Sequence, residues 1–164
     1  MIIREARSGE EAFLAEACVQ IVKFMRQGEQ DKFIEGFPAE VTGDLLTWAG
    51  SHLTEIDRVA FVAESSDGHC VACILGHIEP SSLPMAVSDP SGRVSVCWVS
   101  AAHQRKGIAR LLLEALQAWF AKRGITHLEV AYMTKNTVAR DVWSQLGFTP
   151  FRTFAYKEID GASD

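Results

Sequence analysis

The chain has 164 residues, of which 48% are hydrophobic and 23% charged, and its formal net charge is −5 at pH 7. This length and apolar content suit one folded domain over residues 1–164 with a substantial core. The acidic balance argues against nucleic-acid binding, and the lack of a long apolar run or signal peptide argues against a membrane partner, so we expect a soluble cytoplasmic protein.

The N-terminal part is predicted to be mainly helical. Residues 2–6 favour a short strand, and a helix is predicted from Ser8, acting as N-cap, to Gly28. Residues 29–40 are polar and read as a loop, whose few apolar side chains either pack in the core or grip a ligand. A second, short helix is predicted near residues 42–52.

A β-hairpin is predicted next. Residues 58–65 and 70–78 are rich in β-branched and small apolar residues, and a Ser-Asp-Gly turn separates them. Residues 79–92 contain several prolines and predict an irregular connection. Residues 93–99 are again apolar and predict a central strand.

The last third predicts a crossover and a closing strand. Apolar residues recur at helical spacing over residues 105–123, and a strand is predicted over 127–133, which together with the preceding strand makes a βαβ unit with a parallel pair. Another helix is predicted from Asn136, near its N-cap, to Gly147. Residues 151–159 alternate in polarity and predict the closing strand.

The start of the helix over residues 105–123 carries positive rather than negative side chains. A helix N-terminus has free N–H groups and normally attracts Asp or Glu. Here Arg105, Lys106 and Arg110 add positive charge, and Gly107 has no Cβ to hinder a bulky anion. The pattern indicates a phosphate or pyrophosphate site, and the alternative is a solvated basic turn. Neither a P-loop nor a G-x-G-x-x-G fingerprint occurs.

Two motifs carry a family resemblance. Residues 104–109 resemble the Q/R-x-x-G-x-G/A signature of the GCN5-related N-acetyltransferase (GNAT) superfamily. Asn136, Ala139, Gly147 and Phe148 resemble its later N-x-x-A-x-x-x-Y-x-x-x-G-F helix, at the separation typical of the family. The resemblance implies the GNAT acyltransferase fold, an α/β (α+β) domain. Its central sheet would be mixed and mostly antiparallel, with a parallel pair at the cofactor site and helices on its flanks.

The resemblance also implies an activity and a cofactor site. The chain would be an N-acetyltransferase that uses acetyl-coenzyme A (acetyl-CoA) as cosubstrate and acetylates a primary amine by direct attack in a ternary complex. The rival interpretation is a non-catalytic acyl-CoA-binding or regulatory domain. The residues implied to contact the cofactor are Cys97, Trp98, Val99, Gln104, Arg105, Lys106, Gly107, Ile108, Ala109, Arg110, Asn136 and Trp143. The amine would belong to a small molecule or a peptide, and the sequence leaves a homodimer open.

The catalytic acid and base are less well indicated. Trp143 stands where the family has a tyrosine that is thought to protonate the leaving thiolate, and an indole N–H is no usable acid. Water could protonate the thiolate instead, and the candidate side chains are Tyr132 and Ser144. Many family members place an acid on the fourth strand, but the predicted fourth strand has no carboxylate. The candidates for the base are Glu79, His77 and water.

The cysteines are expected to be reduced thiols without a metal. Cys70 and Cys73, flanked by His69 and His77, have half of a metal-binding pattern, but no second pair follows at zinc spacing. Residues three apart on a strand also point to opposite faces. Cys97 has no neighbouring cation or base in its strand, so a covalent acyl-cysteine route is not favoured.

Overall fold

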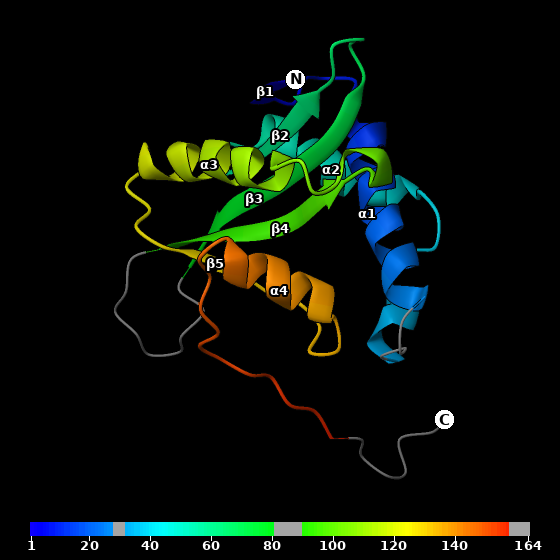
Figure 1. The fold of residues 1–164 in the computed structure, drawn as a ribbon, viewed down its shortest axis with the longest axis vertical. Coiled ribbons are helices and arrows are strands. Elements are labelled where there is room, and N and C mark those ends of the chain that lie inside the picture. Colours follow the sequence, from blue (N-terminus) through cyan, green and yellow to red (C-terminus); the bar gives the residue numbers. More distant parts are fainter. Residues whose placement is uncertain (28–31, 81–89, 158–164) are drawn as a thin grey trace.

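The computed structural model describes residues 1–27, 32–80 and 90–157 (Figure 1). The elements in chain order are β1 (Ile2–Glu5), α1 (Glu11–Gln27), the short 3-10 helix η1 (Lys32–Gly36), α2 (Gly43–Thr54), β2 (Arg58–Glu64), β3 (Cys70–Glu79), β4 (Ser91–Val99), the 3-10 turn η2 (Ala101–His103), α3 (Ile108–Ala121), β5 (Leu128–Val130) and α4 (Thr137–Gln145). No helix within the described ranges is long and apolar enough to span a membrane.

The strands of the described residues form a single five-stranded sheet in the order β1-β2-β3-β4-β5. The pairs from β1 to β4 are antiparallel, whereas β4 and β5 are parallel because α3 carries the chain across one face between them. The predicted mixed, mostly antiparallel sheet with one parallel pair is therefore confirmed. The strand predicted as central, β4, lies between β3 and β5.

Helices cover both faces of the sheet (Figure 1). One hydrophobic cluster joins α3 and Trp143 of α4 to one face, and it includes Ile74, Val94, Leu112, Leu116 and Phe120. A second cluster joins α1 and α2 to the opposite face, and it includes Leu14, Ala49, Val62, Cys73 and Leu75. Successive residues of a strand point to opposite faces, so each strand contributes to both clusters. We call these the α3 face and the α2 face.

Two glycines let α3 lie close against the sheet. A Cβ added to Gly76 would lie 2.9 Å from Leu116 and 3.0 Å from the backbone oxygen of Arg93. A Cβ at Gly92 would lie 2.5 Å from Leu128 and 2.9 Å from Phe120. Contacts of this kind are too short for any side chain, so glycine at these two positions sets the distance between the helix and the sheet.

The first helix begins later than the capping pattern predicts. The prediction of Ser8 as N-cap is wrong, because α1 starts at Glu11. The side chain that holds the preceding turn is Glu10, whose carboxylate accepts the backbone N–H of Arg7 at 2.7 Å. A Ser followed three residues later by Glu resembles a capping box, but here Glu11 is the first helical residue and its carboxylate accepts the N–H of Gly9 at 3.2 Å.

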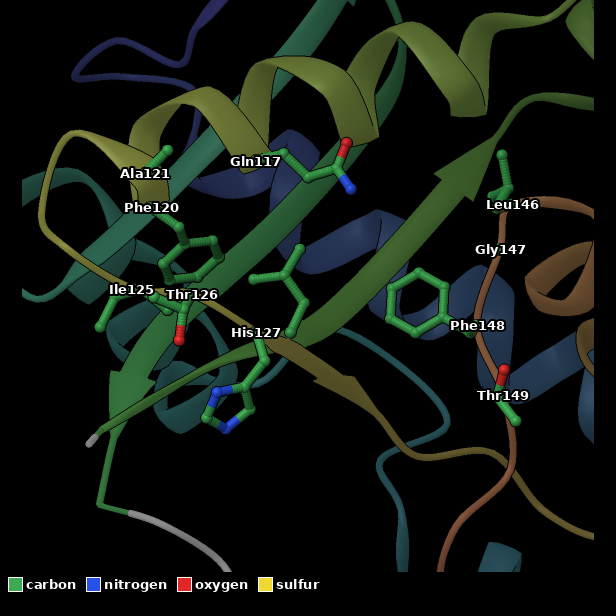
Figure 2. A pocket seen from close by; sticks show the side chains of 11 residues that line it. Gln117, Phe120, Ala121, Ile125, Thr126, His127, Leu146, Gly147, Phe148 and Thr149 are labelled. Carbon is green, nitrogen blue, oxygen red and sulfur yellow. The ribbon is translucent and has the colours of Figure 1, made fainter. Parts of the chain in front are cut away.

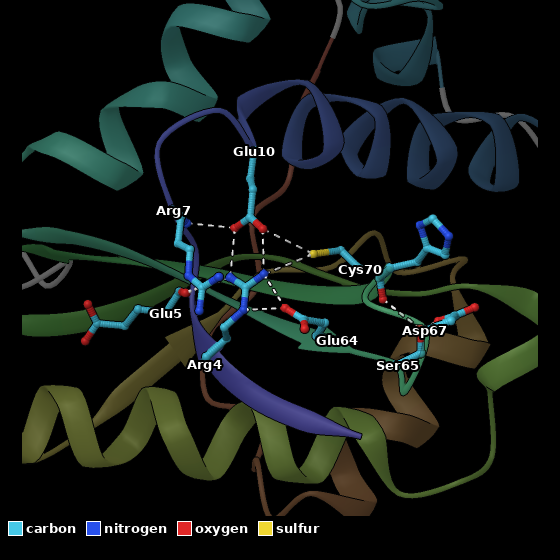
Figure 3. Close-up of polar contacts among 9 residues, drawn as sticks. Arg4, Glu5, Arg7, Glu10, Glu64, Ser65, Asp67 and Cys70 are labelled. Atoms are coloured by element: carbon cyan, nitrogen blue, oxygen red, sulfur yellow. Dashed lines mark hydrogen bonds and ion pairs between the residues drawn. The ribbon is translucent and has the colours of Figure 1, made fainter.

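Glu10 also anchors the N-terminal strand (Figure 3). Arg4 of β1 donates to both carboxylate oxygens of Glu10, at 2.6 and 3.0 Å, and to Glu64 of β2 at 2.7 Å. The thiol of Cys70 lies 3.4 Å from the Glu10 carboxylate. The hydrogen bonds from Arg4 are the largest of the effects that lower the pKa of Glu10 to about 2. The same pairing raises the pKa of Arg4.

The other predicted elements differ from the structure mainly at their ends. The hairpin of β2 and β3 and the helix α2, capped by the Thr42 side chain, are confirmed. β4 starts at Ser91 rather than at residue 93. Within the predicted loop over residues 29–40, η1 forms and Ile34 is buried. Residues 29–31 of that loop, and 81–89 of the predicted connection, lie outside the described residues.

The prediction of a closing strand is wrong for the residues that the structure describes. Residues 151–157 form no strand, and Figure 1 shows this orange-red segment running away from the sheet. Phe151 and Phe154 are 62% and 82% exposed. The alternating pattern is typical of a half-buried strand, but within the described residues this segment does not pair with the sheet.

Candidate functional site

The turn before α3 exposes a run of backbone N–H groups. Gly107 is the N-cap of α3, with a left-handed φ of 78°, and it makes no side-chain capping hydrogen bond. Arg105 is also left-handed, at φ 59°. Within the described part of the chain, no acceptor takes a hydrogen bond from the N–H groups of residues 105–109. Neighbouring N–H groups in a left-handed turn form a concave site for an anion.

The charge of this turn fits the same ligand. The side chains of Arg105, Lys106 and Arg110 are exposed, and the first turn of α3 contains no acidic residue. Nothing lies within 4 Å of a Cβ added at Gly107, so an anion can approach the backbone there. The helix predicted from residue 105 starts at Ile108, and the three preceding residues form a turn instead, which we call the anion-binding turn after the ligand that its N–H groups and charge would suit.

Two other side chains brace the turn from within. Gln104 donates from its side-chain amide to the carbonyl oxygen of Val99 at 3.1 Å, and Lys106 donates to the carbonyl of Ala102 at 2.9 Å. Ile108 is buried in the core, whereas Ala109 is half-buried. The predicted cofactor residues 104–110 therefore lie together at one helix start, where some face outward and others hold the loop shape.

The sheet opens beside this turn. β4 and β5 pair only at Gly92 with Leu128, Arg93 with Glu129, and Val94 with Val130, after which residues 95–99 of β4 pair with β3 alone. Backbone direction alternates along a strand, and the N–H of Ser100 bonds to Val71 on the β3 side. The backbone groups of Cys97 and Val99 therefore point to the opposite side, where no strand of the described residues pairs with them.

The side chains of this open stretch differ in their surroundings. Trp98 packs edge-on against Phe13 of α1, with ring centroids 6.0 Å apart, and belongs to the α2 face. Cys97 packs on the α3 face, where desolvation raises the pKa of its thiol to about 12. A thiol with this pKa stays protonated at neutral pH and is a poor nucleophile.

The residues in and around α4 include several that the sequence assigned to the site. The side chain of Asn136 accepts a hydrogen bond from the N–H of Ala139 at 2.9 Å, which confirms the predicted N-cap. Trp143 is only 8% exposed and packs edge-on against Phe148 in the core. Tyr132 is half-buried beside the same core cluster, on the α3 face, whereas Ser144 is exposed to solvent.

Glu79 lies on the opposite face of the sheet. It is the last residue of β3, and it forms an ion pair with Arg93 of β4, whose Nε donates to it at 2.7 Å. The Nε2 atom of His77 lies 3.4 Å from the second oxygen of Glu79. The Nδ1 atom of His77 is 2.9 Å from the hydroxyl of Ser95. The two candidates for the base, Glu79 and His77, therefore belong to one connected polar cluster.

Sequence reasoning missed Ser95 and Arg93 as parts of this cluster. Leu75 pairs with Val96 and Gly76 with Val94, so Ser95 is an extra residue in β4 that forms a β-bulge. The only available signal was a polar residue inside an apolar strand, because neither a bulge nor a cross-strand register can be read from one sequence.

A cavity of about 410 Å³ lies away from these groups, at the other end of α3 (Figure 2). Its walls come from the end of α3, from the start of β5 and from residues 146–149, and they include Phe120, Ile125, Leu128 and Phe148. None of the predicted cofactor or catalytic residues lines it. Since α3 rises by about 1.5 Å per residue, the cavity and the anion-binding turn are about 20 Å apart along the helix.

The predicted free cysteines are consistent with the geometry. Cys18, Cys70, Cys73 and Cys97 form no disulfide. No cluster of three or more His, Cys, Asp or Glu side chains suited to a metal ion occurs in residues 1–27, 32–80 and 90–157.

Solved structures resemble the chain over nearly its whole length. The tetramutant of the BH1408 protein from Bacillus halodurans is 17% identical, with a TM-score of 0.81 over 97% of this chain and 100% of that chain. The aminoglycoside 6'-N-acetyltransferase AAC(6')-Ig from Acinetobacter haemolyticus is 20% identical, with a TM-score of 0.71 over 98% of this chain and 100% of that chain. At such identities the likeness shows a shared fold.

A further similar structure was solved with a ligand. AAC(6')-Iy in complex with the bisubstrate analogue CoA-S-monomethyl-acetylneamine is 19% identical, with a TM-score of 0.69 over 96% of this chain and 97% of that chain. A comparison with sequence families gives a match to the acetyltransferase (GNAT) family over residues 22–148. That range includes the anion-binding turn, the open part of β4 and the helix α4.

Proposed function

The chain belongs to the acetyltransferase (GNAT) family, and we propose that it transfers an acetyl group from acetyl-CoA to a primary amine by direct attack in a ternary complex. The observation that carries the proposal is the anion-binding turn at α3, next to a stretch of β4 without a partner on one side. The family resemblance of the two sequence motifs supports the same assignment.

The turn fits the pyrophosphate of acetyl-CoA. Residues 105–109 offer N–H groups that the described chain leaves without acceptors, and two left-handed residues shape them into a concave surface. Arg105, Lys106 and Arg110 supply positive charge, which stabilises a bound diphosphate together with the helix dipole. Gln104 holds the turn against β4, and Ile108 and Ala109 fix the start of the helix.

The open stretch of β4 fits the pantetheine arm and the thioester. The backbone N–H and C=O of Cys97 and the N–H of Val99 face the side where β5 has departed, so they are placed to hydrogen-bond an extended ligand, whereas the C=O of Val99 accepts from Gln104. An N–H directed at the thioester oxygen would stabilise the charge that develops there. Acetyl-CoA, when bound, supplies the activated acetyl group.

Three further residues are assigned to the cofactor site. Asn136 keeps its capping hydrogen bond to Ala139 and presents its remaining amide group near the cofactor. Trp98 fixes β4 through its packing against Phe13, so its contribution is to the position of the backbone. Trp143 forms part of the wall between α4 and the core. These assignments follow the family motif and the location of each residue.

The candidate acid and base lie on opposite faces of the sheet. A lysine-like amine, with a reference pKa near 10.4, is an ammonium at neutral pH and must lose a proton before it attacks. We assign the base to the α2 face, in the polar cluster that contains Glu79 and His77. Tyr132, on the α3 face, is the assigned proton donor to the departing thiolate. Water remains available for either role.

We assign the amine to a small molecule in the first instance, with a peptide amine as the alternative. Two of the similar structures are aminoglycoside 6'-N-acetyltransferases, and the formal charge of −5 favours a cationic partner over nucleic acid. Nothing in this assignment requires a membrane or a metal ion.

We also propose that the protein forms a homodimer through residues 151–157. Phe151 and Phe154 are exposed in one chain, and no strand of the described residues pairs with the outer edge of β5. The cavity beside β5 is lined in part by aromatic and aliphatic side chains. In this dimer, residues 151–157 of each copy would pair as a strand with the exposed β5 edge of the other copy, so that both edges are covered.

Calorimetry with acetyl-CoA tests the cofactor site directly. We expect micromolar binding by the wild type and a loss of about tenfold or more in affinity for Gly107→Glu, because the carboxylate would occupy and repel the phosphate position. Gly124→Glu is the matched control, because Gly124 also has a left-handed φ, of 77°, with open space around it.

The two variants share the added charge and the backbone strain, so equal affinities in both would show that the turn is only a solvated helix start. A wild type that binds would next be tested with a panel of amines, with release of coenzyme A followed as free thiol.

A further inference from the structure

A row of polar side chains crosses the α2 face of the sheet. Arg58 of β2 is in register with His77 of β3, His77 with Arg93 of β4, and Arg93 with Glu129 of β5. Arg93 is 3.4 Å from Glu129 and also pairs with Glu79. These side chains are at least half-buried. Partly buried ionic groups of this kind cost free energy unless they are paired, and Arg93 pairs with both Glu79 and Glu129.

The β-bulge places Ser95 at the end of this row. Ser95 is the extra residue of β4, and it directly follows Val94, where the pairing between β4 and β5 ends. Bulges re-aim side chains, and they are frequent next to active sites. The hydroxyl of Ser95 therefore meets His77 at the point where the two parallel strands part, next to the backbone stretch assigned to the thioester.

The contacts of His77 favour one tautomer. Glu79 can only accept a hydrogen bond, so the proton of the neutral imidazole belongs on Nε2, which is 3.4 Å from the carboxylate. Nδ1 is then the unprotonated nitrogen, and it accepts from the hydroxyl of Ser95 at 2.9 Å. Arg93 holds Glu79 from the other side, at 2.7 Å, and so fixes the carboxylate that orients the ring.

We propose that Ser95 and His77 form the path by which the amine substrate loses its proton, with Glu79 and Arg93 as positioning residues. The inference rests on the proposed acetyltransferase function. In the step, the Ser95 hydroxyl takes a proton from the ammonium group and passes its own proton to Nδ1 of His77. The amine is then neutral, Ser95 is unchanged, and His77 carries the positive charge next to the Glu79 carboxylate.

The groups that face His77 come from several elements. Arg58 of β2 and Arg93 of β4 are its cross-strand neighbours, and Glu79 shares its strand. His52 of α2 is electrostatically coupled to His77; it is 2% exposed, and burial lowers its pKa to about 4. His52 therefore stays neutral at pH 7 and does not compete for the proton. Its Nε2 atom has no partner among the described residues.

The assignment also fixes the side from which the amine arrives. The path lies on the α2 face, whereas Tyr132 lies on the α3 face. Proton removal from the amine and proton delivery to the thiolate therefore take place on opposite faces of the sheet. The amine is expected to approach between α2 and the end of the sheet, over the polar row.

Steady-state kinetics of paired variants test the path. His77→Asn keeps a hydrogen-bonding group close to Ser95 but cannot take a proton, and Ser95→Ala removes the hydroxyl that Ser95→Thr keeps. At pH 7 we expect kcat to fall about 10²-fold or more in His77→Asn and Ser95→Ala, with the calorimetric Kd for acetyl-CoA unchanged. Ser95→Thr should retain most of the activity. His69→Asn, at the exposed far end of the same hairpin, is the control.

A pH series separates proton removal from a merely structural role. Near pH 10 a large share of a lysine-like amine is already neutral, so the kcat deficit of His77→Asn should shrink to a few-fold. A deficit that is equally large at pH 7 and pH 10 would contradict the path.

Nitrogen-detected NMR of the wild type gives a readout that does not depend on turnover. We expect the neutral ring of His77 to carry its proton on Nε2, and a proton on Nδ1 would overturn the inference.

The two proposals fail in different ways. If the wild type does not bind acetyl-CoA, both are wrong. If the wild type binds acetyl-CoA and acetylates an amine while His77→Asn keeps its full rate at pH 7, the acetyltransferase function holds and the path does not exist.

Discussion

Tyr132 is the residue that we propose as the proton donor to the departing thiolate. It is half-buried beside the core cluster of α3 and α4, in the same cluster as the Trp143 that replaces the tyrosine of the family motif. We expect Tyr132→Phe to lower kcat by about 10²-fold, because the variant keeps the ring and loses the proton donor. The affinity for acetyl-CoA should not change, since no backbone group of the cofactor site is altered.

The second tyrosine of the chain provides the control for this experiment. Tyr156 is 61% exposed and is not one of the residues assigned to the site, so Tyr156→Phe removes the same hydroxyl group from a residue without an assigned role. Equal kcat values in the two variants would show that water or another group protonates the thiolate.

Single residues were predictable where their signal is local. Asn136 was predicted as a cap because capping involves a residue and the next turn of the same helix, and its hydrogen bond to Ala139 confirms it. The ion pair of Glu79 with Arg93 was not predictable, since it depends on the register of two strands. Ser8 was wrongly predicted as a cap because α1 begins only at Glu11, after a turn in which the Glu10 carboxylate accepts the N–H of Arg7.

The C-terminal segment over residues 151–157 permits a test at the scale of an element. If it mediates self-association, Phe154→Asp should raise the dimer dissociation constant about tenfold or more, because a charge replaces an aromatic contact. Phe154 is 82% exposed within one chain, so the folded monomer should not be destabilised. Analytical ultracentrifugation at several protein concentrations measures this constant.

Phe24→Asp is the matched control for the segment. Phe24 is an exposed aromatic residue of α1, far in sequence from residues 151–157. A wild type that sediments as a monomer at every concentration, or equal effects of the two substitutions, would exclude dimerisation through this segment.

Most elements were predicted correctly in type, and their ends were predicted less well. The helix α3 and the hairpin of β2 and β3 have strong local periodicity, which tertiary structure did not override. The start of α3 was placed three residues early because the left-handed backbone at Arg105 and Gly107 is invisible in a pattern of apolar residues. Residues 151–157 show that alternation alone does not predict a strand, because the segment must also pair with an edge of the sheet.

At the scale of the whole molecule, the Arg4–Glu10 pair couples stability to pH. The pKa of Glu10 is lowered from 4.5 to about 2, so the pair stabilises the fold above pH 4.5 and this contribution is lost as the pH falls toward 2. We expect Glu10→Gln to lower the free energy of unfolding at pH 7 by about 1–2 kcal/mol, a discounted figure because both side chains are partly exposed.

Urea unfolding at a series of pH values measures this contribution. The difference between the wild type and Glu10→Gln should narrow steadily from pH 4.5 down to about 2, because the Glu10 carboxylate of the unfolded wild type becomes protonated in this range before that of the folded state does. Glu5→Gln, an exposed neighbour of Arg4 in β1, should behave as the wild type at every pH. A Glu10→Gln deficit that is independent of pH would assign the effect to packing.

The overall fold was predictable because two motifs and the order of elements agreed with one known family. The residues that connect distant parts were not. Arg4 donates hydrogen bonds to both Glu10 and Glu64, and no local sequence pattern predicts that these three side chains contact one another. The same holds for the polar row on the α2 face.

The close seating of α3 against Gly76 and Gly92 has a consequence for amide hydrogen exchange. α3 buries Ile108, Leu112, Leu113, Leu116, Trp119 and Phe120, whereas α4 buries only Trp143 among its own residues. Amides of α3 therefore exchange only through large openings of the molecule, and amides of α4 exchange through local fraying of lower free energy. The proposed cofactor site therefore has one part on α3, which opens rarely, and another part on α4, which frays more easily. Ligand binding should slow exchange in α4 far more than in α3.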